Sequence, residues 1–168
     1  MKTVAVLSDS HIPARAAAIP EKFLEQVENA DITVHCGDFE TREVYNQLEQ
    51  LTQEFYAVKG NCERFNPPNS KKFEEKNHSI GAYHGTGITP RGDHETLLNI
   101  AENRLNVEIL LHGHTHKQET VKKQGKLLLN PGSCTGVGGG SSQPGNPTMT
   151  VLKLSKNSAT VEELELSD

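Results

Sequence analysis

The chain opens with TVAVLSDSH at residues 3–11, an apolar run that ends abruptly in polar residues. Residues 3–7 are continuous, partly β-branched and bounded by Ser8-Asp9-Ser10, which is typical of a buried strand followed by a loop. The opening therefore predicts a core strand with Asp9 and His11 at its carboxyl end.

Helix and strand patterns alternate from this strand to residue 60. Residues 21–28 and 42–51 carry apolar side chains at helical spacing, and residues 32–36 and 55–58 form two further apolar runs. This β-α-β-α-β order predicts a parallel sheet with right-handed crossovers.

The second half of the chain is mostly β in pattern. Residues 71–84 predict two short strands around Asn77, Thr89-Pro90 predicts the start of a helix extending to Leu105, and residues 109–111 predict a strand. Strand patterns follow at 119–123, 126–129, 148–154 and 159–165, with a Gly- and Pro-rich loop at 135–147. Without an internal repeat or linker, we expect a single domain over residues 1–168.

Composition excludes several classes of protein. The 168 residues carry a net charge of −5, which argues against a general nucleic-acid binder. No apolar run approaches the ~20 residues of a membrane span, and the first run is too short for a signal peptide. Three cysteines do not form a disulfide framework, so we expect a cytoplasmic protein.

Polar side chains that suit metal ions follow five of the expected strands. Because ligands gather at the carboxyl ends of strands in α/β sheets, these distant loops can converge on one place. Two carboxylates, one amide and four imidazoles exceed the needs of one tetrahedral ion and suit two ions that share a carboxylate. The seven candidates are Asp9, His11, Asp38, Asn61, His84, His114 and His116.

Each short motif also has an ordinary explanation. Gly37-Asp38 and Gly60-Asn61 are common turn pairs, and a lone His84 is compatible with a purely structural role. The pair of histidines in residues 113–116 is stronger evidence, and the whole set in this order is far more specific than any member. Of the other histidines, we expect His35 to be structural and His78 and His94 to be solvated.

These motifs resemble those of the calcineurin-like metallophosphoesterase superfamily, and in particular its small single-domain phosphodiesterases. Residues 8–11 (SDSH), 60–62 (GNC) and 130–133 (NPGS) carry the closer similarity, which covers residues 3–134 and the β-rich tail. The resemblance implies an α/β (α+β) fold in which a two-sheet β-sandwich is flanked by helices.

The resemblance also implies a dinuclear metal centre with a metal-bound hydroxide as nucleophile. Asp38 would bridge the two ions, and Asp38, Asn61 and His84 would be catalytic. Mn²⁺ is the family-typical ion, and the donors also suit Ni²⁺, Co²⁺, Fe²⁺ and Zn²⁺. The first ion would be held by Asp9, His11, Asp38 and His116, and the second by Asp38, Asn61, His84 and His114.

Two positions depart from the pattern of the superfamily. Many members have His directly after Gly-Asn, where it is taken to assist the leaving group, whereas this chain has Cys62. A thiol is a poorer general acid than imidazole near neutral pH, so Cys62 is either a passive pocket residue or a weak acid. Thr86 stands where close relatives often carry another histidine.

The sequence thus predicts a divalent-metal-dependent phosphodiesterase that acts on a small phosphodiester. The alternative is a non-catalytic scaffold of the same fold, similar to a retromer coat subunit, for which a large exposed apolar patch would be the mark. Arg64, Arg91 and Lys117 are either cations of the substrate cleft or ordinary surface charges. Family analogy alone favours a homodimer, and nothing indicates membrane or nucleic-acid partners.

Overall fold

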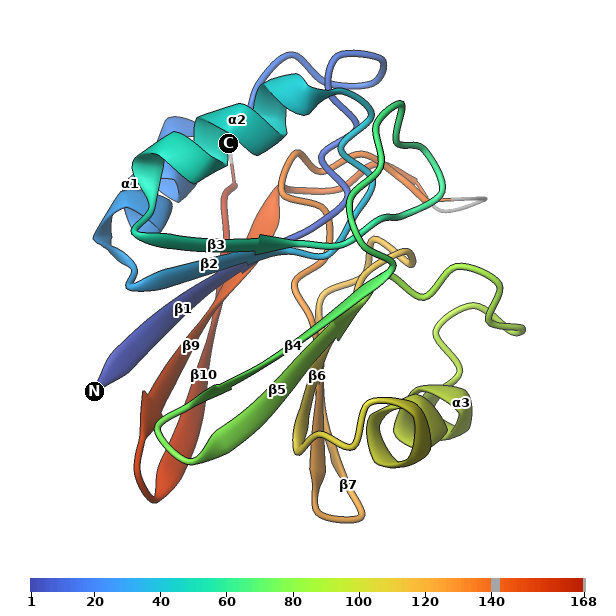
Figure 1. Cartoon of the computed structure of the whole chain (residues 1–168). Coiled ribbons are helices and arrows are strands. Elements are labelled where there is room, and N and C mark those ends of the chain that lie inside the picture. The colour runs from blue at the N-terminus through green and yellow to red at the C-terminus, as the bar shows by residue number, and fades with distance from the viewer. Residues whose placement is uncertain (140–142, 168) are drawn as a thin grey trace.

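The structure, a computed structural model, describes residues 1–139 and 143–167 as two five-stranded β-sheets packed face to face (Figure 1). The first sheet has the order β10-β9-β1-β2-β3 and the second β4-β5-β6-β8-β7. The strands of the first sheet are β1 (Lys2–Leu7), β2 (Ile32–His35), β3 (Glu54–Ala57), β9 (Thr148–Ser155) and β10 (Ser158–Glu165). The strands of the second sheet are β4 (Ser70–Glu75), β5 (His78–Tyr83), β6 (Ile109–Leu111), β7 (Glu119–Lys123) and β8 (Lys126–Asn130).

Helices cover the outer face of each sheet (Figure 1). Helices α1 (Glu21–Asn29) and α2 (Arg42–Leu51) pack on the first sheet, and α3 (His94–Asn99) continues into a π-helical turn, η1 (Ile100–Arg104), on the second. The expected two-sheet sandwich flanked by helices, of the α/β class, is confirmed.

Alternating side chains along the strands separate three apolar layers. Val4 and Val6 of β1 lie between the two sheets, whereas Ala5 and Leu7 pack toward α1 and α2. In β8, Leu128 packs with α3 while its neighbours face the sandwich. Because side chains alternate with period two, each strand contributes to the core on both of its faces.

Parallel pairing brings the carboxyl ends of distant strands together. Strand β1 pairs in parallel with β2, and β2 with β3, while β5, β6 and β8 form a parallel run in the other sheet. The loops that leave these ends gather in one region of the molecule, between the two sheets (upper centre of Figure 1). The predicted β-α-β-α-β opening is thereby confirmed.

The structure differs from the sequence expectations in two places. The third helix begins at His94 rather than at Pro90, because the Asp93 carboxylate caps it by accepting from the backbone N–H of Thr96 at 3.1 Å. His78 is buried rather than solvated, since its ring contacts the Glu108 carboxylate. Residues 140–142 of the expected loop at 135–147 lie outside the described residues.

A hairpin turn at Gln124-Gly125 joins β7 to β8, with φ of 50° and 76° at its two central residues. Across residues 1–139 and 143–167, none of the helices has the length and apolar character needed to span a membrane.

Candidate metal centre

All seven candidate side chains lie in loops that follow strands, and their donor atoms come together. Asp9 follows β1, Asp38 follows β2 and Asn61 follows β3, while His84 follows β5. His11 also follows β1, and the last two candidates, His114 and His116, follow β6. Two groups have donor atoms within 4.8 Å of one another, and Asp38 belongs to both: Asp9, His11, Asp38 and His116 in the first group, and Asp38, His84 and His114 in the second.

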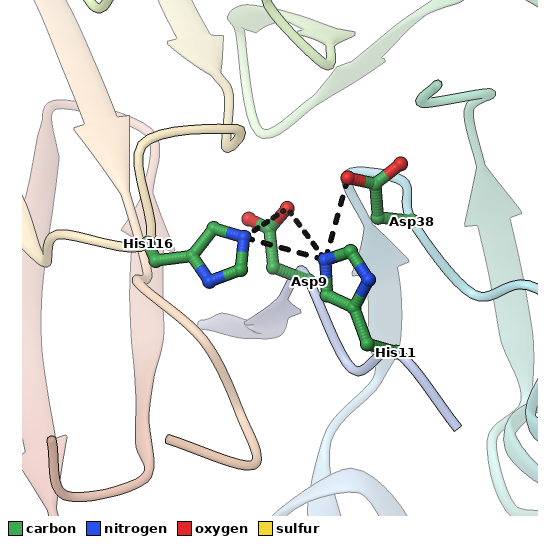
Figure 2. A group of neighbouring side chains, drawn as sticks. All are labelled: Asp9, His11, Asp38 and His116. Carbon is green, nitrogen blue, oxygen red and sulfur yellow. Dashed lines mark hydrogen bonds and ion pairs between the residues drawn. The ribbon is translucent and has the colours of Figure 1, made fainter. Parts of the chain in front are cut away.

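The first group surrounds one oxygen of Asp9 (Figure 2). The Nε2 atoms of His11 and His116 lie 3.3 Å apart, and they approach Oδ1 of Asp9 to 4.0 Å and 3.5 Å. Oδ2 of Asp38 closes the group at 3.4 Å from Nε2 of His11. Two imidazoles and two carboxylates thus point at a common centre.

The second group shares Asp38 with the first. Nε2 of His84 lies 3.2 Å from Oδ2 of Asp38 and 3.3 Å from Nδ1 of His114. Because Oδ2 of Asp38 is close to nitrogens of both groups, this carboxylate is placed to bridge two cations.

Asn61 lies at the exposed edge of the second group. Its side-chain oxygen is oriented toward acceptors, 3.1 Å from each carboxylate oxygen of Asp38 and 3.3 Å from Nε2 of His84. The reversed amide would donate hydrogen bonds to the same atoms. A cation between these groups requires the orientation in which the amide oxygen of Asn61 points toward them.

Hydrogen bonds to backbone carbonyls orient two of the imidazoles. Nδ1 of His84 donates to the carbonyl oxygen of Cys36 at 2.7 Å, and Nδ1 of His116 donates to that of Val137 at 2.7 Å. With the proton held on Nδ1, the Nε2 lone pair of each ring faces the carboxylates. This arrangement is the usual way in which proteins orient metal-ligating histidines.

The carboxylates are oriented in the same way. Oδ1 of Asp38 accepts from the backbone N–H groups of Asn61 at 2.7 Å and Cys62 at 3.0 Å, which leaves Oδ2 for the centre. Oδ2 of Asp9 accepts from the N–H of His114 at 3.0 Å, whereas its Oδ1 is buried without any hydrogen bond. A buried carboxylate oxygen without a donor is costly, and a cation would satisfy it.

Burial and the charges of neighbouring side chains shift the pKa values of the groups in this site. Burial raises the pKa of Asp9 to about 7. Burial also opposes ionisation of Asp38, but the hydrogen bond and charge of His84 hold the pKa of this carboxyl well below its usual range. Burial lowers the pKa of His84, but the nearby carboxylates outweigh it and raise the pKa to about 9. The buried carboxylates therefore attract positive charge.

Five of the seven candidates have a left-handed backbone, which non-glycine residues adopt rarely. The φ angles are 55° at Asp9, 48° at His11, 67° at Asp38, 75° at His114 and 64° at His116. Each such residue costs of order 1 kcal/mol, and such conformations cluster at functional sites. The left-handed conformation at these residues turns their side chains away from the strand direction and toward the shared centre.

Two glycines allow the loops to approach closely. A Cβ at Gly60 would lie 2.7 Å from the backbone nitrogen of Asp38, and one at Gly113 would lie 2.8 Å from Oδ2 of Asp9. Neither contact is tolerable for a real Cβ, so a side chain at either position would displace a candidate ligand.

The NPGS stretch at residues 130–133 ties the loops to one another. Nδ2 of Asn130 donates to the Thr115 hydroxyl at 2.9 Å, and the Ser133 hydroxyl donates to the carbonyl of Asp9 at 2.8 Å. This stretch therefore supports the centre from outside rather than contributing donors to it.

Glu63 is a supporting residue whose role the sequence does not reveal. Its Oε1 accepts from the N–H of Gly60 at 2.7 Å and its Oε2 from the N–H of Phe39 at 2.7 Å. One carboxylate thus joins the loop that carries Asp38 to the loop that carries Asn61. Its place three residues after Gly60 is the only local signal for this role.

Three further residues singled out from the sequence lie near the site but are not among the candidate ligands. Cys62 is half-buried, and burial together with the Asp38 carboxylate raises the pKa of its thiol to about 12. Arg91 donates to the carbonyl of His114 at 2.6 Å, and Lys117 lines a small cavity beside His116.

His35 is structural as expected: it is buried, stacks on Phe39 at a centroid distance of 3.6 Å and contacts the Ser10 hydroxyl. His94 lies away from the centre and pairs with Glu119 at 2.8 Å.

Comparison with known proteins agrees with this geometry. A model of the calcineurin-like phosphoesterase superfamily domain matches residues 1–157. A protein of Methanocaldococcus jannaschii named as a probable metallophosphoesterase is 34% identical over 152 residues, covering 90% of this chain and 74% of the relative. A second such protein, from Methanothermobacter thermautotrophicus, is 34% identical and covers 79% and 77%.

The fold is also shared with solved structures. Vps29 from Entamoeba histolytica, crystallised in complex with Zn²⁺, superposes with a TM-score of 0.84 at 31% identity, covering 97% of this chain and 98% of that one. The match of the family model over nearly the whole length, the relatives and the two-sheet fold lead to one conclusion: the chain belongs to the calcineurin-like phosphoesterase superfamily.

Proposed function

We propose that the chain is a divalent-metal-dependent phosphodiesterase and that residues 1–168 act as one catalytic domain. The observation that carries this proposal is the buried Oδ1 of Asp9, which has no hydrogen-bond donor and faces imidazole nitrogens on three sides. Burial lowers the pKa of His11 and His116, and neutral imidazoles do not satisfy a bare carboxylate oxygen, whereas the same groups form a donor set around a cation.

The donor atoms present fit two ions. Asp9, His11, Asp38 and His116 would hold one ion, and the second would be held by Asp38, Asn61, His84 and His114. When bound, two divalent ions lower the pKa of water toward neutrality and neutralise the negative charge on phosphoryl oxygens. Mixed nitrogen and oxygen donors suit Mn²⁺, and the Zn²⁺ complex of the Entamoeba Vps29 supports a wider range of borderline ions.

The chain's own residues would orient the substrate and the ions. Asp38 would keep the two ions together, and its position is fixed by the two backbone N–H groups that bind its other oxygen. His84 would present Nε2 to the second ion because Cys36 holds its Nδ1 proton. Asn61, at the exposed edge, would lie where substrate enters.

Preference for diesters rests on Cys62. A thiol whose pKa is raised by burial and by Asp38 is a poor proton donor to a departing alkoxide. Diesters with acidic leaving groups need no such donor, so they are the class that this site suits.

The scaffold alternative draws support from the likeness to Vps29 structures. It would call for an exposed apolar docking patch. Within residues 1–139 and 143–167, Met1 is the one large hydrophobic side chain that is exposed. The complete donor set and this polar surface favour the enzyme. A cytoplasmic location belongs to the same proposal.

The test is Asp38→Asn, with Glu43→Gln on the exposed face of α2 as the control. A neutral amide bridges two cations poorly, so the variant should bind less Mn²⁺ by elemental analysis and hydrolyse bis(4-nitrophenyl) phosphate at least about 100-fold more slowly. Circular dichroism should show that it is folded. Near-normal turnover of Asp38→Asn with two ions bound would refute the assignment.

A further inference from the structure

A cavity of about 310 Å³ lies beside the candidate metal centre and is lined by Lys59, Gly60, Asn69, Tyr83, Thr86 and Arg104. Three of these residues are close in sequence to candidate ligands. Gly60 precedes Asn61, Tyr83 precedes His84 and Thr86 follows it by two residues. The cavity therefore opens next to the second group of donors.

The cavity continues into a larger one of about 660 Å³ on the side of α3. The two share Tyr83, Thr86 and Arg104 as lining residues. A substrate whose phosphodiester lies at the metal centre thus has room for a substituent that extends away from it.

The charge of the smaller cavity is positive. Lys59 donates to the neutral amide of Asn66 at 3.3 Å, and the Arg104 guanidinium lies 5.2 Å from the centroid of the Tyr83 ring. Among the residues that the structure describes, neither cation has a carboxylate within ion-pair distance. The acid in the larger cavity, Glu95, is itself paired with Lys123.

The position of Arg104 is set by the π-helical turn. Arg104 is the last residue of η1, and the Tyr83 hydroxyl donates to the carbonyl of Thr86 at 3.2 Å, which holds the ring against the loop after β5. Single π-helical turns often occur at functional sites. The guanidinium and the ring together present a cation backed by an aromatic face.

We infer that Lys59 and Arg104 form a subsite for a second anionic group, so that the substrate is a phosphodiester that also carries a terminal phosphate. This inference rests on the proposed function. The scissile diester takes its counter-charge from the metal centre, and the two uncompensated cations next to it match a further negative charge. Exposed ion pairs contribute about threefold each, so two should favour such a substrate by about tenfold.

The first experiment compares two aryl diesters with the same leaving group. One is the 4-nitrophenyl phosphodiester of propane-1,3-diol, and the other has its free hydroxyl phosphorylated. With Mn²⁺ bound, kcat/KM should be about tenfold higher for the phosphorylated probe. In the double variant Lys59→Gln/Arg104→Gln this ratio should fall to near one, and in Lys156→Gln, at the distant β9–β10 turn, it should persist.

A ratio near one in the wild-type protein would refute the subsite while leaving the phosphodiesterase intact. Absence of hydrolysis of both probes would refute the proposed function instead. A binding measurement would then test whether the subsite exists. In an NMR titration of the chelator-treated protein, the phosphorylated probe should shift the amides of Gly60, Asn69 and Thr86. Its affinity should fall about tenfold in the double variant. Equal shifts with the hydroxyl probe would overturn the inference.

Discussion

Glu63→Gln is the most direct test of how the two loops that carry Asp38 and Asn61 are held. The carboxylate accepts one backbone N–H with each oxygen, from Gly60 and Phe39, both at 2.7 Å. Glutamine keeps one acceptor but turns an NH₂ group toward the other N–H. Hydrogen bonds to a charged group contribute about 1.5–3 kcal/mol. Because Glu63 is half-buried, we expect a loss near the lower end, about 2 kcal/mol for Gln and about 3 kcal/mol for Ala.

Urea unfolding with chelator present measures this loss without a contribution from metal. Mn²⁺ binding to the folded variant, measured by calorimetry, should weaken by about 10–100-fold, as is typical when a group that supports metal ligands is removed. Glu25→Gln, exposed on α1, is the matched control and should stay within about 0.5 kcal/mol of the wild type.

The two measurements separate the possible outcomes. Lower stability with unchanged Mn²⁺ affinity would mean that Glu63 serves the fold but not the centre. Wild-type stability together with wild-type affinity would show that this carboxylate does not join the loops.

Other perturbations test the remaining conclusions. Mn²⁺ at 100 times its Kd should stabilise the protein by about 2.7 kcal/mol in scanning calorimetry, and a chelator should reverse this; an unchanged Tm would argue against binding to the folded state. Cys62→Ala should barely change turnover of aryl diesters, whereas Cys62→His should raise turnover of poor leaving groups most; loss of aryl turnover with both ions bound would give the thiol a chemical role. Burial lowers the pKa of His112 to about 3, below the ordinary 6.5, so its contribution to stability is complete above pH 6.5 and is lost as the pH falls toward 3. In chelator, His112→Phe should therefore flatten the stability profile in this range, and a profile as steep as that of the wild type would exclude His112 as the cause. Light scattering should show a homodimer at micromolar concentration, and a strict monomer would end that expectation.

Local patterns were sufficient to predict most of the fold. Continuous apolar strands, helical spacing and Gly-containing turns depend on neighbours in sequence, and these features lie within one or two residues of their expected bounds. The sequence predicts the start of α3 wrongly, because Pro90 suggests the first turn whereas Asp93 caps the helix. Asp93 as an N-cap residue, followed by the acidic Glu95 in the first turn, is a usable signal for this start.

The candidate site was predictable to the extent that its donors follow strands. The rule that parallel strands present their carboxyl ends together groups Asp9 with Asp38, which follow the paired strands β1 and β2. His84 follows β5 of the other sheet, so its place beside Asp38 depends on how the two sheets pack. Contacts made only by folding were not predictable. His78 is buried against Glu108, and the cavity cations Lys59 and Arg104 are not themselves part of any motif.

The left-handed backbone at five candidate ligands has a consequence for engineering. At about 1 kcal/mol each, the strain sums to about 5 kcal/mol, which is comparable with the whole net stability of a small domain. Glycine would relieve it at every one of these positions. A library screened for heat resistance alone would therefore enrich glycine where the side chain makes no hydrogen bond to the backbone, at His11 and His114, and would discard candidate metal donors while the fold improved. Any effort to make this protein more robust must hold these five positions fixed and seek its gains in the helices and the outer strands.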